Sequence, residues 1–244
     1  MSFARNNHVA TLLLDGRVLV TGGVGSNSGL PVENSAEVYD PQTGKWSTID
    51  HMANARYNHQ STLLPDGRVL VTGGFNVSAF HVPLKTTEIY DPATGTWKNA
   101  AAMSTSRATH LSFLLQNGGV LVAGGWTQPV NVLTPTATVE VYDPGMDSWT
   151  SVSPMSAARG AISNGSVMLW DGRVLVTGGR NANDVLASVD LYNPISGAWS
   201  LTASMEYARS GSHTATLLPD GRVLVAGGRG TSGTPLSSAE VYTP

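Results

Sequence analysis

The feature that most constrains this chain is an internal repeat with a period of about 50 residues. Four landmarks recur in the same order: a Gly-Gly pair, a tyrosine, a tryptophan and a Met-x-x-x-Arg motif. The glycine pairs begin at Gly22, Gly73, Gly124, Gly178 and Gly227, and the tyrosines are Tyr39, Tyr90, Tyr142, Tyr192 and Tyr242. Because several kinds of landmark keep one period, chance does not explain them. The pattern predicts one supersecondary unit per repeat, packed on its neighbours.

Each repeat predicts four short strands, as the second repeat shows. Residues 59–64 and 68–72 flank Asp66-Gly67, a pair that predicts a hairpin with a type I′ turn. A third strand over residues 87–90 is followed by a proline- and glycine-containing turn and a fourth strand from Trp97. The second strand is apolar on both faces, which predicts burial between neighbouring sheets. No segment predicts a helix.

The order Gly-Gly, Glu-x-Tyr-Asp-Pro and Thr-Gly-x-Trp resembles that of kelch-repeat β-propellers over the whole chain. The form from Asp15 to Gly23 is similar to bacterial kelch proteins and to the propeller of galactose-oxidase-like enzymes. The resemblance implies an all-β, five-bladed propeller with four-stranded antiparallel blades, folded as one domain over residues 1–244. Its repeats cover residues 1–51, 52–102, 103–154, 155–204 and 205–244. The fold does not imply one function, because such propellers include enzymes and adaptors.

The fifth repeat stops after its third strand, so we expect a fifth blade without its outer, tryptophan-bearing strand. Two interpretations stay open. In the first, the trimmed blade is held by packing against its neighbour and the protein is a monomer. In the second, the chain is part of a larger propeller, or an engineered or amplified array, that self-associates through the unpaired strand at residues 238–242.

Composition excludes several classes of function. The chain has no cysteine, which excludes disulfides, thiol catalysis and zinc sites built on thiolates. Charged residues form only 13% of the chain, the net charge is −3, and no basic run predicts a nucleic-acid partner. No apolar stretch has the length of a signal-peptide core or a membrane span. We expect a soluble protein without a membrane partner, whose natural form, if secreted, would need a leader absent from this sequence.

The loops between the second and third strands differ most from repeat to repeat, whereas the strands are near copies. Because binding residues gather on variable loops above a rigid scaffold, we predict a binding face there, called the top face below. The loops cover residues 24–35, 75–86, 126–138, 180–188 and 229–238. Candidate ligand contacts on the top face are Tyr57, Phe75, Asn76, Trp126, Arg180 and Arg229. The alternative is that these are ordinary solvated loops.

Five further arginines enter the first strands from the same face and are also candidate ligand contacts: Arg5, Arg56, Arg107, Arg159 and Arg209. The kelch resemblance implies that such arginines bind acidic peptides through bidentate pairs. A structural role competes with this one, because each repeat also carries a carboxylate before its tyrosine: Glu37, Glu88, Glu140, Asp190 and Glu240. A buried charge without a partner is costly, so we favour pairing of arginine with carboxylate.

Histidine recurs at His8, His59, His110 and His213, with Asn164 and two extra residues around Ser163 in the fourth repeat. Side chains of the first strand point into the gaps between blades, so we expect hydrogen bonds to a neighbouring blade and no metal or other cofactor. Glu206-Tyr207, and Tyr57 beside Arg56, only loosely resemble sialidase groups, and the radical centre of galactose-oxidase-like enzymes needs a cysteine.

No catalytic set stands apart from the repeat. The sequence therefore predicts a non-enzymatic scaffold that binds a protein, peptide or glycan at the top face. The alternatives are a carbohydrate-active enzyme or a fragment of one, and a repeat array without a ligand.

Overall fold

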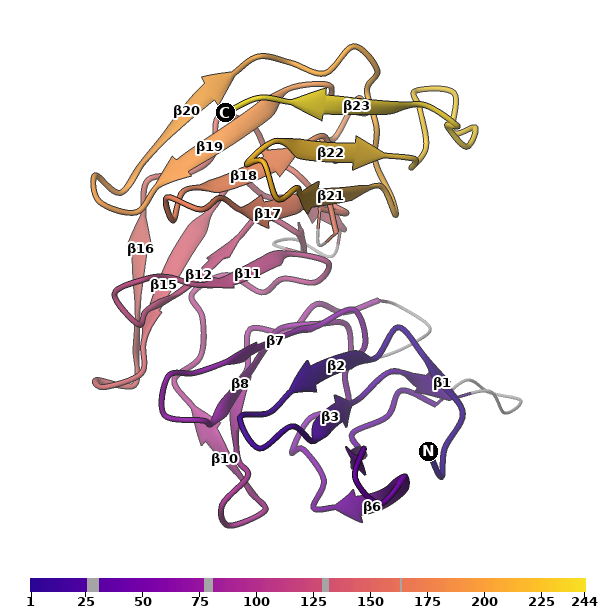
Figure 1. The fold of residues 1–244 in the computed structure, drawn as a ribbon, viewed down its shortest axis with the longest axis vertical. Helices are drawn as coiled ribbons and strands as arrows, with labels where there is room; N and C mark the ends of the chain where they lie inside the picture. Colours follow the sequence, from indigo (N-terminus) through magenta and orange to yellow (C-terminus); the bar gives the residue numbers. More distant parts are fainter. Residues whose placement is uncertain (26–30, 77–80, 129–131, 163) are drawn as a thin grey trace. The chain divides into compact units, whose positions relative to one another are not determined.

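The computed structural model describes residues 1–25, 31–76, 81–128, 132–162 and 164–244. Every regular element in these ranges is a β-strand, and none is a helix long and apolar enough to span a bilayer (Figure 1). The strands form five antiparallel blades within the described ranges, four with four strands and the fifth with three. The predicted fold class, a five-bladed β-propeller with an incomplete fifth blade, is confirmed.

Contacts divide the chain into two compact units. The first contains residues 1–108 and 142–149, and the second contains residues 109–141 and 150–244. Blades 1 and 2 belong to the first unit and blades 4 and 5 to the second, while the residues of blade 3 are shared between them.

Blades 1 and 2 have the strand order that the repeat predicts. Blade 1 contains β2 (Val9–Leu12), β3 (Val18–Thr21), β5 (Ala36–Asp40) and β6 (Lys45–Ile49). Blade 2 contains β7 (Gln60–Leu63), β8 (Val69–Thr72), β9 (Thr87–Asp91) and β10 (Thr96–Ala100). In both blades the strands pair in sequence order, so each hairpin follows directly from the one before.

Blades 3 to 5 repeat this arrangement. Blade 3 contains β11 (Leu111–Leu114), β12 (Val120–Ala123), β15 (Val139–Asp143) and β16 (Ser148–Val152). Blade 4 contains β17 (Ser166–Met168), β18 (Val174–Thr177), β19 (Val189–Asn193) and β20 (Ala198–Thr202). Blade 5 contains β21 (Thr214–Leu217), β22 (Val223–Ala226) and β23 (Ala239–Tyr242), the yellow end of the ribbon in Figure 1.

The core lies between neighbouring blades, as the two-sided apolar second strands predict. In β8, Val69, Leu70 and Val71 are all fully buried. Val69 and Val71 pack with Leu19 and Val38 of blade 1. In the second unit, Val174 and Val176 of blade 4 pack in the same way with residues of blade 3. Burial on both faces makes these strands a rigid support for the loops above them.

The hairpin between the first and second strands differs from the predicted type I′ turn. The Gly67 amide donates to the Leu64 carbonyl and the Leu64 amide to the Arg68 carbonyl. Only Gly67 of the Asp-Gly pair has a positive φ, whereas a type I′ turn needs two such residues. The geometry is a type I turn followed by a left-handed glycine, in which the Asp66 side chain accepts from the Arg68 amide. The position of the turn was predicted correctly and its type was wrong.

The top-face loops contain short ladders that the sequence did not predict. In the first loop, β1 (Arg5–Asn6) pairs with β4 (Val24–Gly25). In the third loop, β13 (Trp126–Thr127) pairs with β14 (Thr134–Pro135). In the other loops the equivalent residue after the glycine pair forms two isolated bridges; these residues are Phe75, Arg180 and Arg229. These bridges hold the first residue of each loop, while parts of three loops (residues 26–30, 77–80 and 129–131) lie outside the described residues.

Candidate functional site

The repeated arginines connect strands within their own blades. Arg56 forms an ion pair with Glu88 at 2.7 Å and donates to the carbonyls of Gly73 and Thr86 at 2.6 and 3.2 Å. Three further arginines bind their own blade in the same way, in the pairs Arg5–Glu37, Arg159–Asp190 and Arg209–Glu240. The pairing of arginine with carboxylate is confirmed for these four blades. Arg107 and Glu140 are equally buried.

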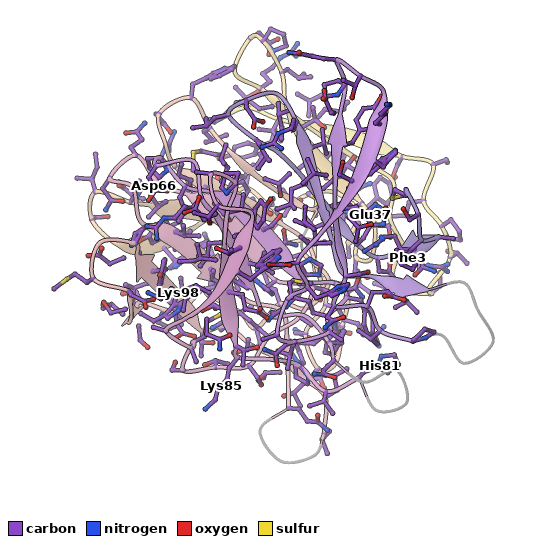
Figure 2. All side chains as sticks on the ribbon, turned by 90° about the horizontal axis from the view of Figure 1, so that it is seen from below. Phe3, Glu37, Asp66, His81, Lys85 and Lys98 are labelled. Atoms are coloured by element: carbon purple, nitrogen blue, oxygen red, sulfur yellow. The ribbon has the colours of Figure 1, made fainter. Side chains whose placement is uncertain are left out.

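Burial determines the electrostatics of these pairs. Arg56 and Arg159 are fully buried, and this desolvation lowers the pKa of each guanidinium although its carboxylate partner acts in the opposite direction. In blade 1 the Arg5 guanidinium also lies 5.9 Å from the centre of the Phe3 ring. Phe3 and Glu37, the ion-pair partner of Arg5, are labelled in Figure 2. Side chains held in this way cannot reach a ligand above the loops without breaking the blade. The binding role of these five arginines remains a prediction without support from their geometry.

The same arginines also join neighbouring blades through the backbone. The amide of Gly23 in blade 1 donates to the Arg56 carbonyl at 2.9 Å, and the amide of Gly179 in blade 4 donates to the Arg209 carbonyl at 2.9 Å. A Cβ on the preceding glycine, Gly22, would collide with the Arg56 carbonyl oxygen, and Gly22 has a φ of +60°. The close approach of two backbones explains the glycine at Gly22, Gly124 and Gly178, whereas Gly227 has no such close neighbour and keeps only the positive φ, +66°.

Histidines of the first strand bind the preceding blade, as predicted. His59 Nε2 lies 2.8 Å from Thr21 Oγ1, and His213 Nε2 lies 2.9 Å from the Thr177 carbonyl oxygen. Burial, and then the charge of Arg56, hold the pKa of His59 well below its usual value. Burial also lowers the pKa of His213. A neutral imidazole that donates from Nε2 fits both positions. Asn164 replaces the histidine in blade 4, and Ser163 lies outside the described residues.

Phe75 and Tyr57 form a closed aromatic cluster on blade 2. Their rings are 5.4 Å apart, and the two residues are bridged through their backbones. His81, labelled in Figure 2, covers both rings, because its own ring lies 5.5 Å from Phe75 and its Nδ1 contacts the Tyr57 hydroxyl. Phe75 and Tyr57 are each only 5% exposed, and burial raises the pKa of Tyr57. We call these three residues the Phe75 cluster. It is a small core with little surface for a ligand.

Trp126 occupies the equivalent position on blade 3 and lines an open cleft. The cleft has a volume of about 570 Å³ and is lined by Trp126 and residues 132–135 of one loop and residues 180–182 of the next. Trp126 is half-buried, Arg180 is exposed, and Val132 is 63% exposed. We call this the Trp126 cleft. It brings together an aromatic ring, a cation and apolar side chains, all within the second compact unit.

Gly160 supports the indole of Trp126. A Cβ built on Gly160 would lie 2.5 Å from Cε2 of the ring, so the indole rests directly on the backbone of the next blade. Gly160 follows Arg159, at the place that Tyr57 occupies after Arg56. The sequence analysis missed this residue, although a glycine among larger residues at that repeat position was a readable signal.

The remaining predicted contacts lie apart from the cleft. Arg229 is exposed and donates to the Gly233 carbonyl of its own loop at 2.9 Å. Asn76 follows Phe75 and is half-buried, and its amide donates to the Val82 carbonyl. Of the predicted top-face residues, the structure thus brings Trp126 and Arg180 together at one cleft and Tyr57 and Phe75 together in a closed cluster. Within the described ranges, no group of three or more His, Asp or Glu residues has the arrangement of a metal site.

These features define a kelch-type β-propeller, and comparison with known proteins agrees. The family model of the kelch motif matches residues 5–53, 56–104, 108–156 and 162–206. This chain therefore belongs to the kelch-repeat family. The solved structure of YjhT is similar to it with a TM-score of 0.75 at 18% identity, over 96% of this chain and 80% of that one.

Curated relatives share the repeats at moderate identity. Kelch-like protein 26 of Danio rerio is 30% identical over 77% of this chain and 30% of its own length. The kelch repeat-containing protein kel-10 of Caenorhabditis elegans is 25% identical over 77% of this chain and 32% of its own length. Beta-scruin of Limulus polyphemus is 28% identical over 79% of this chain and 22% of its own length. The chain thus spans less than a third of each of these relatives.

Proposed function

We propose that this chain is a non-catalytic interaction module that holds a segment of a partner protein in the Trp126 cleft of its top face. The observation that carries the proposal is the pairing of a half-buried indole with an exposed guanidinium in a cleft of about 570 Å³. The cleft walls come from two loops above blades 3 and 4, whose second strands are fully buried. Variable loops on such a support are a common location of binding sites.

The chemistry of the cleft favours a peptide that combines an apolar or aromatic side chain with a carboxylate. The Trp126 ring is fixed against the Gly160 backbone, so little side-chain freedom is lost when a ligand stacks on it. Arg180 offers a planar fork of donors that matches a carboxylate. Val132 and Leu133, which are 63% and 38% exposed, add apolar surface beside the ring. Aromatic residues and arginine are the side chains that most often dominate binding energy at protein interfaces.

Selection of a displayed random peptide library on the full chain tests the proposal. We expect selected peptides to carry acidic and apolar residues together. The double variant Trp126→Ala/Arg180→Ala should bind them at least about tenfold more weakly, as expected for loss of two central contacts. The matched control is Trp170→Ala, because Trp170 is 73% exposed on a hairpin outside the cleft. Its affinity should equal that of the original chain.

Three outcomes would contradict the proposal. Selected peptides that bind the double variant as tightly as the original chain would place the site elsewhere. A chain that selects no peptide but binds members of a glycan array would exclude a peptide ligand. Turnover of glycosidase or oxidase substrates that is lost in the double variant would contradict the non-catalytic assignment.

A further inference from the structure

Gly160 joins the two walls of the Trp126 cleft. Gly125 precedes Trp126, and its amide donates to the Arg159 carbonyl at 2.8 Å. The next residue, Gly160, exchanges two backbone hydrogen bonds with Arg180, of 2.8 and 3.0 Å. All of these residues lie in the second compact unit. The loop that carries the indole and the loop that carries the guanidinium are therefore anchored at the same two residues of blade 4.

The segment after Gly160 is bound to blade 3, the blade that carries Trp126. The amides of Ala161 and Ile162 donate to the side-chain oxygen and the carbonyl oxygen of Thr109, each at 3.3 Å. Ala161 and Thr109 have φ values of +56° and +51°, a region that residues other than glycine rarely adopt. Contacts to blade 3 on both sides of Gly160 thus fix its position against the indole.

Gly160 lies against a face of the indole and not against its edge. A Cβ built on this glycine would lie 2.5 Å from Cε2 of Trp126, 2.8 Å from Nε1 and 2.9 Å from Cδ2. Cε2 is a fusion carbon with three bonded neighbours in the ring plane, so an atom can approach it this closely only from above or below that plane. Because this face is covered, the part of the half-buried ring that reaches the cleft is its other face and its edge.

The Arg180 side chain leaves the backbone on the side where Gly160 has no side chain. The two residues are direct partners in an antiparallel bridge, and the side chains of such partners stand on the same face. In blade 2 the equivalent partners are Tyr57 and Phe75, whose rings pack 5.4 Å apart. In blade 4 the indole of Trp126 occupies the room that a side chain at position 160 would need.

Glycine at this position is an exception among the repeats. The equivalent residues of the other four are Asn6, Tyr57, Ala108 and Ser210. The φ of Gly160 lies outside the left-handed region, so the backbone conformation does not require glycine here. The three atoms nearest to an added Cβ all belong to Trp126. The missing side chain therefore acts on the position of the indole.

We propose that Gly160 determines the specificity of the Trp126 cleft, an inference that rests on the proposed peptide-binding function. With no side chain at position 160, the indole lies flat on the backbone and offers its free face to a flat ring of the partner, aromatic or proline. A carboxylate of the same segment reaches Arg180. A side chain at position 160 would push the indole into the cleft and leave less room for such a ring.

The test repeats the displayed-peptide selection on three full chains: the original, Gly160→Ala and Gly145→Ala. Peptides selected on the original chain should be enriched in aromatic residues or proline near acidic residues. Gly160→Ala should bind them at least about tenfold more weakly, as expected when a central contact is displaced. A new selection on Gly160→Ala should lose the enrichment in rings.

Gly145→Ala is the matched control. Gly145 is exposed, its φ also lies outside the left-handed region, and the nearest atom to an added Cβ is Asp143 Oδ1 at 3.3 Å. It is not among the residues that line the cleft. This variant should bind the selected peptides as the original chain does.

NMR of the original chain tests the packing without a variant or a ligand. We expect nuclear Overhauser contacts between the α protons of Gly160 and the indole of Trp126. In Gly160→Ala the indole N–H resonance of Trp126 should shift, while amide resonances of blades 1 and 2 keep their positions. Changes throughout the spectrum would show a structural role for Gly160 and overturn the specificity role.

The outcomes separate this inference from the proposed function. Peptides that lose affinity for Trp126→Ala/Arg180→Ala but not for Gly160→Ala would overturn the inference and leave the function in place. Peptides that bind both variants as tightly as the original chain would overturn both. Selection of aliphatic side chains as often as rings on the original chain would show that the free face of the indole is not recognised. Absence of Overhauser contacts between Gly160 and the indole would remove the contact on which the inference depends.

Discussion

The Phe75 cluster and the Trp126 cleft occupy equivalent places in two repeats but have opposite properties. Each has an aromatic residue directly after the glycine pair and an arginine nearby. On blade 2, Phe75 faces Tyr57 and is covered by His81, and the buried Arg56 directly precedes Tyr57 in the chain. On blade 3, Trp126 faces Gly160, and its neighbour Arg180 reaches solvent. Phe75 is thus enclosed by Tyr57 of its own blade and by His81, whereas Trp126 lies against the Gly160 backbone of the next blade and stays half-exposed.

The largest expected difference between the two regions is the loss of stability when an arginine is replaced. Arg56→Met leaves Glu88 buried without its partner, and we expect it to lower the free energy of unfolding by about 3–5 kcal/mol. Arg180→Met changes an exposed side chain and should alter it by less than about 0.5 kcal/mol. Urea unfolding of both variants measures the difference. Similar losses of unfolding free energy for the two variants would mean that Arg180 has a structural role like that of Arg56.

Substitution of the aromatic residue should also destabilise the Phe75 cluster more than the Trp126 cleft. Phe75→Ala opens a cavity in a closed cluster and should lower the free energy of unfolding by about 3 kcal/mol. Trp126→Ala removes a half-exposed ring, and we expect a loss of about 1 kcal/mol, within the usual range for single substitutions. Thermal and urea unfolding give both values. A larger loss at Trp126 than at Phe75 would contradict the assignment of Phe75 to the core and Trp126 to the site.

A smaller difference should appear with pH. The pKa of His59 is lower in the folded chain than in the unfolded chain, so the unfolded chain binds more protons as the pH falls below about 6.5. Stability should therefore fall as the pH is lowered. His59 should contribute a slope of up to about 1.4 kcal/mol per pH unit. His59→Gln should reduce this slope. Asn164→Gln, at the equivalent position of blade 4, should leave it unchanged, and equal slopes for His59→Gln and the original chain would show that His59 is not a source of the dependence.

Much of the repeated blade structure was predictable from the sequence, because repetition reveals the contacts that every blade needs. The recurrence of one arginine and one carboxylate predicted pairs such as Arg159–Asp190, and the position of the first-strand histidines predicted bonds such as that of His59 to Thr21. The turn type was wrong because Asp-Gly is compatible with two hairpin geometries, and the Asp66 contact with the Arg68 amide favours the one observed.

The cleft was only partly predictable, for a physical reason. Trp126 and Arg180 were candidates because they differ from their counterparts, yet the same reasoning selected Phe75 and Tyr57, which are buried. Exposure at these positions depends on residues that come from other segments, such as the Gly160 backbone for Trp126 and the His81 ring for Phe75. A repeat pattern reports what the units share, so it does not report which variable side chains cover each other.

The bond from a glycine amide to the arginine carbonyl of the next blade has a consequence for synthesis on the ribosome. Gly23, Gly74, Gly125 and Gly179 donate to Arg56, Arg107, Arg159 and Arg209, which are made 30 to 34 residues later. Chains begin to fold from the amino terminus as they emerge. The glycine amide of each blade can therefore form its hydrogen bond only after the arginine at the start of the following blade has been synthesised. We expect the nascent chain to mature one blade behind the point of synthesis, with a single unfinished blade at its growing end.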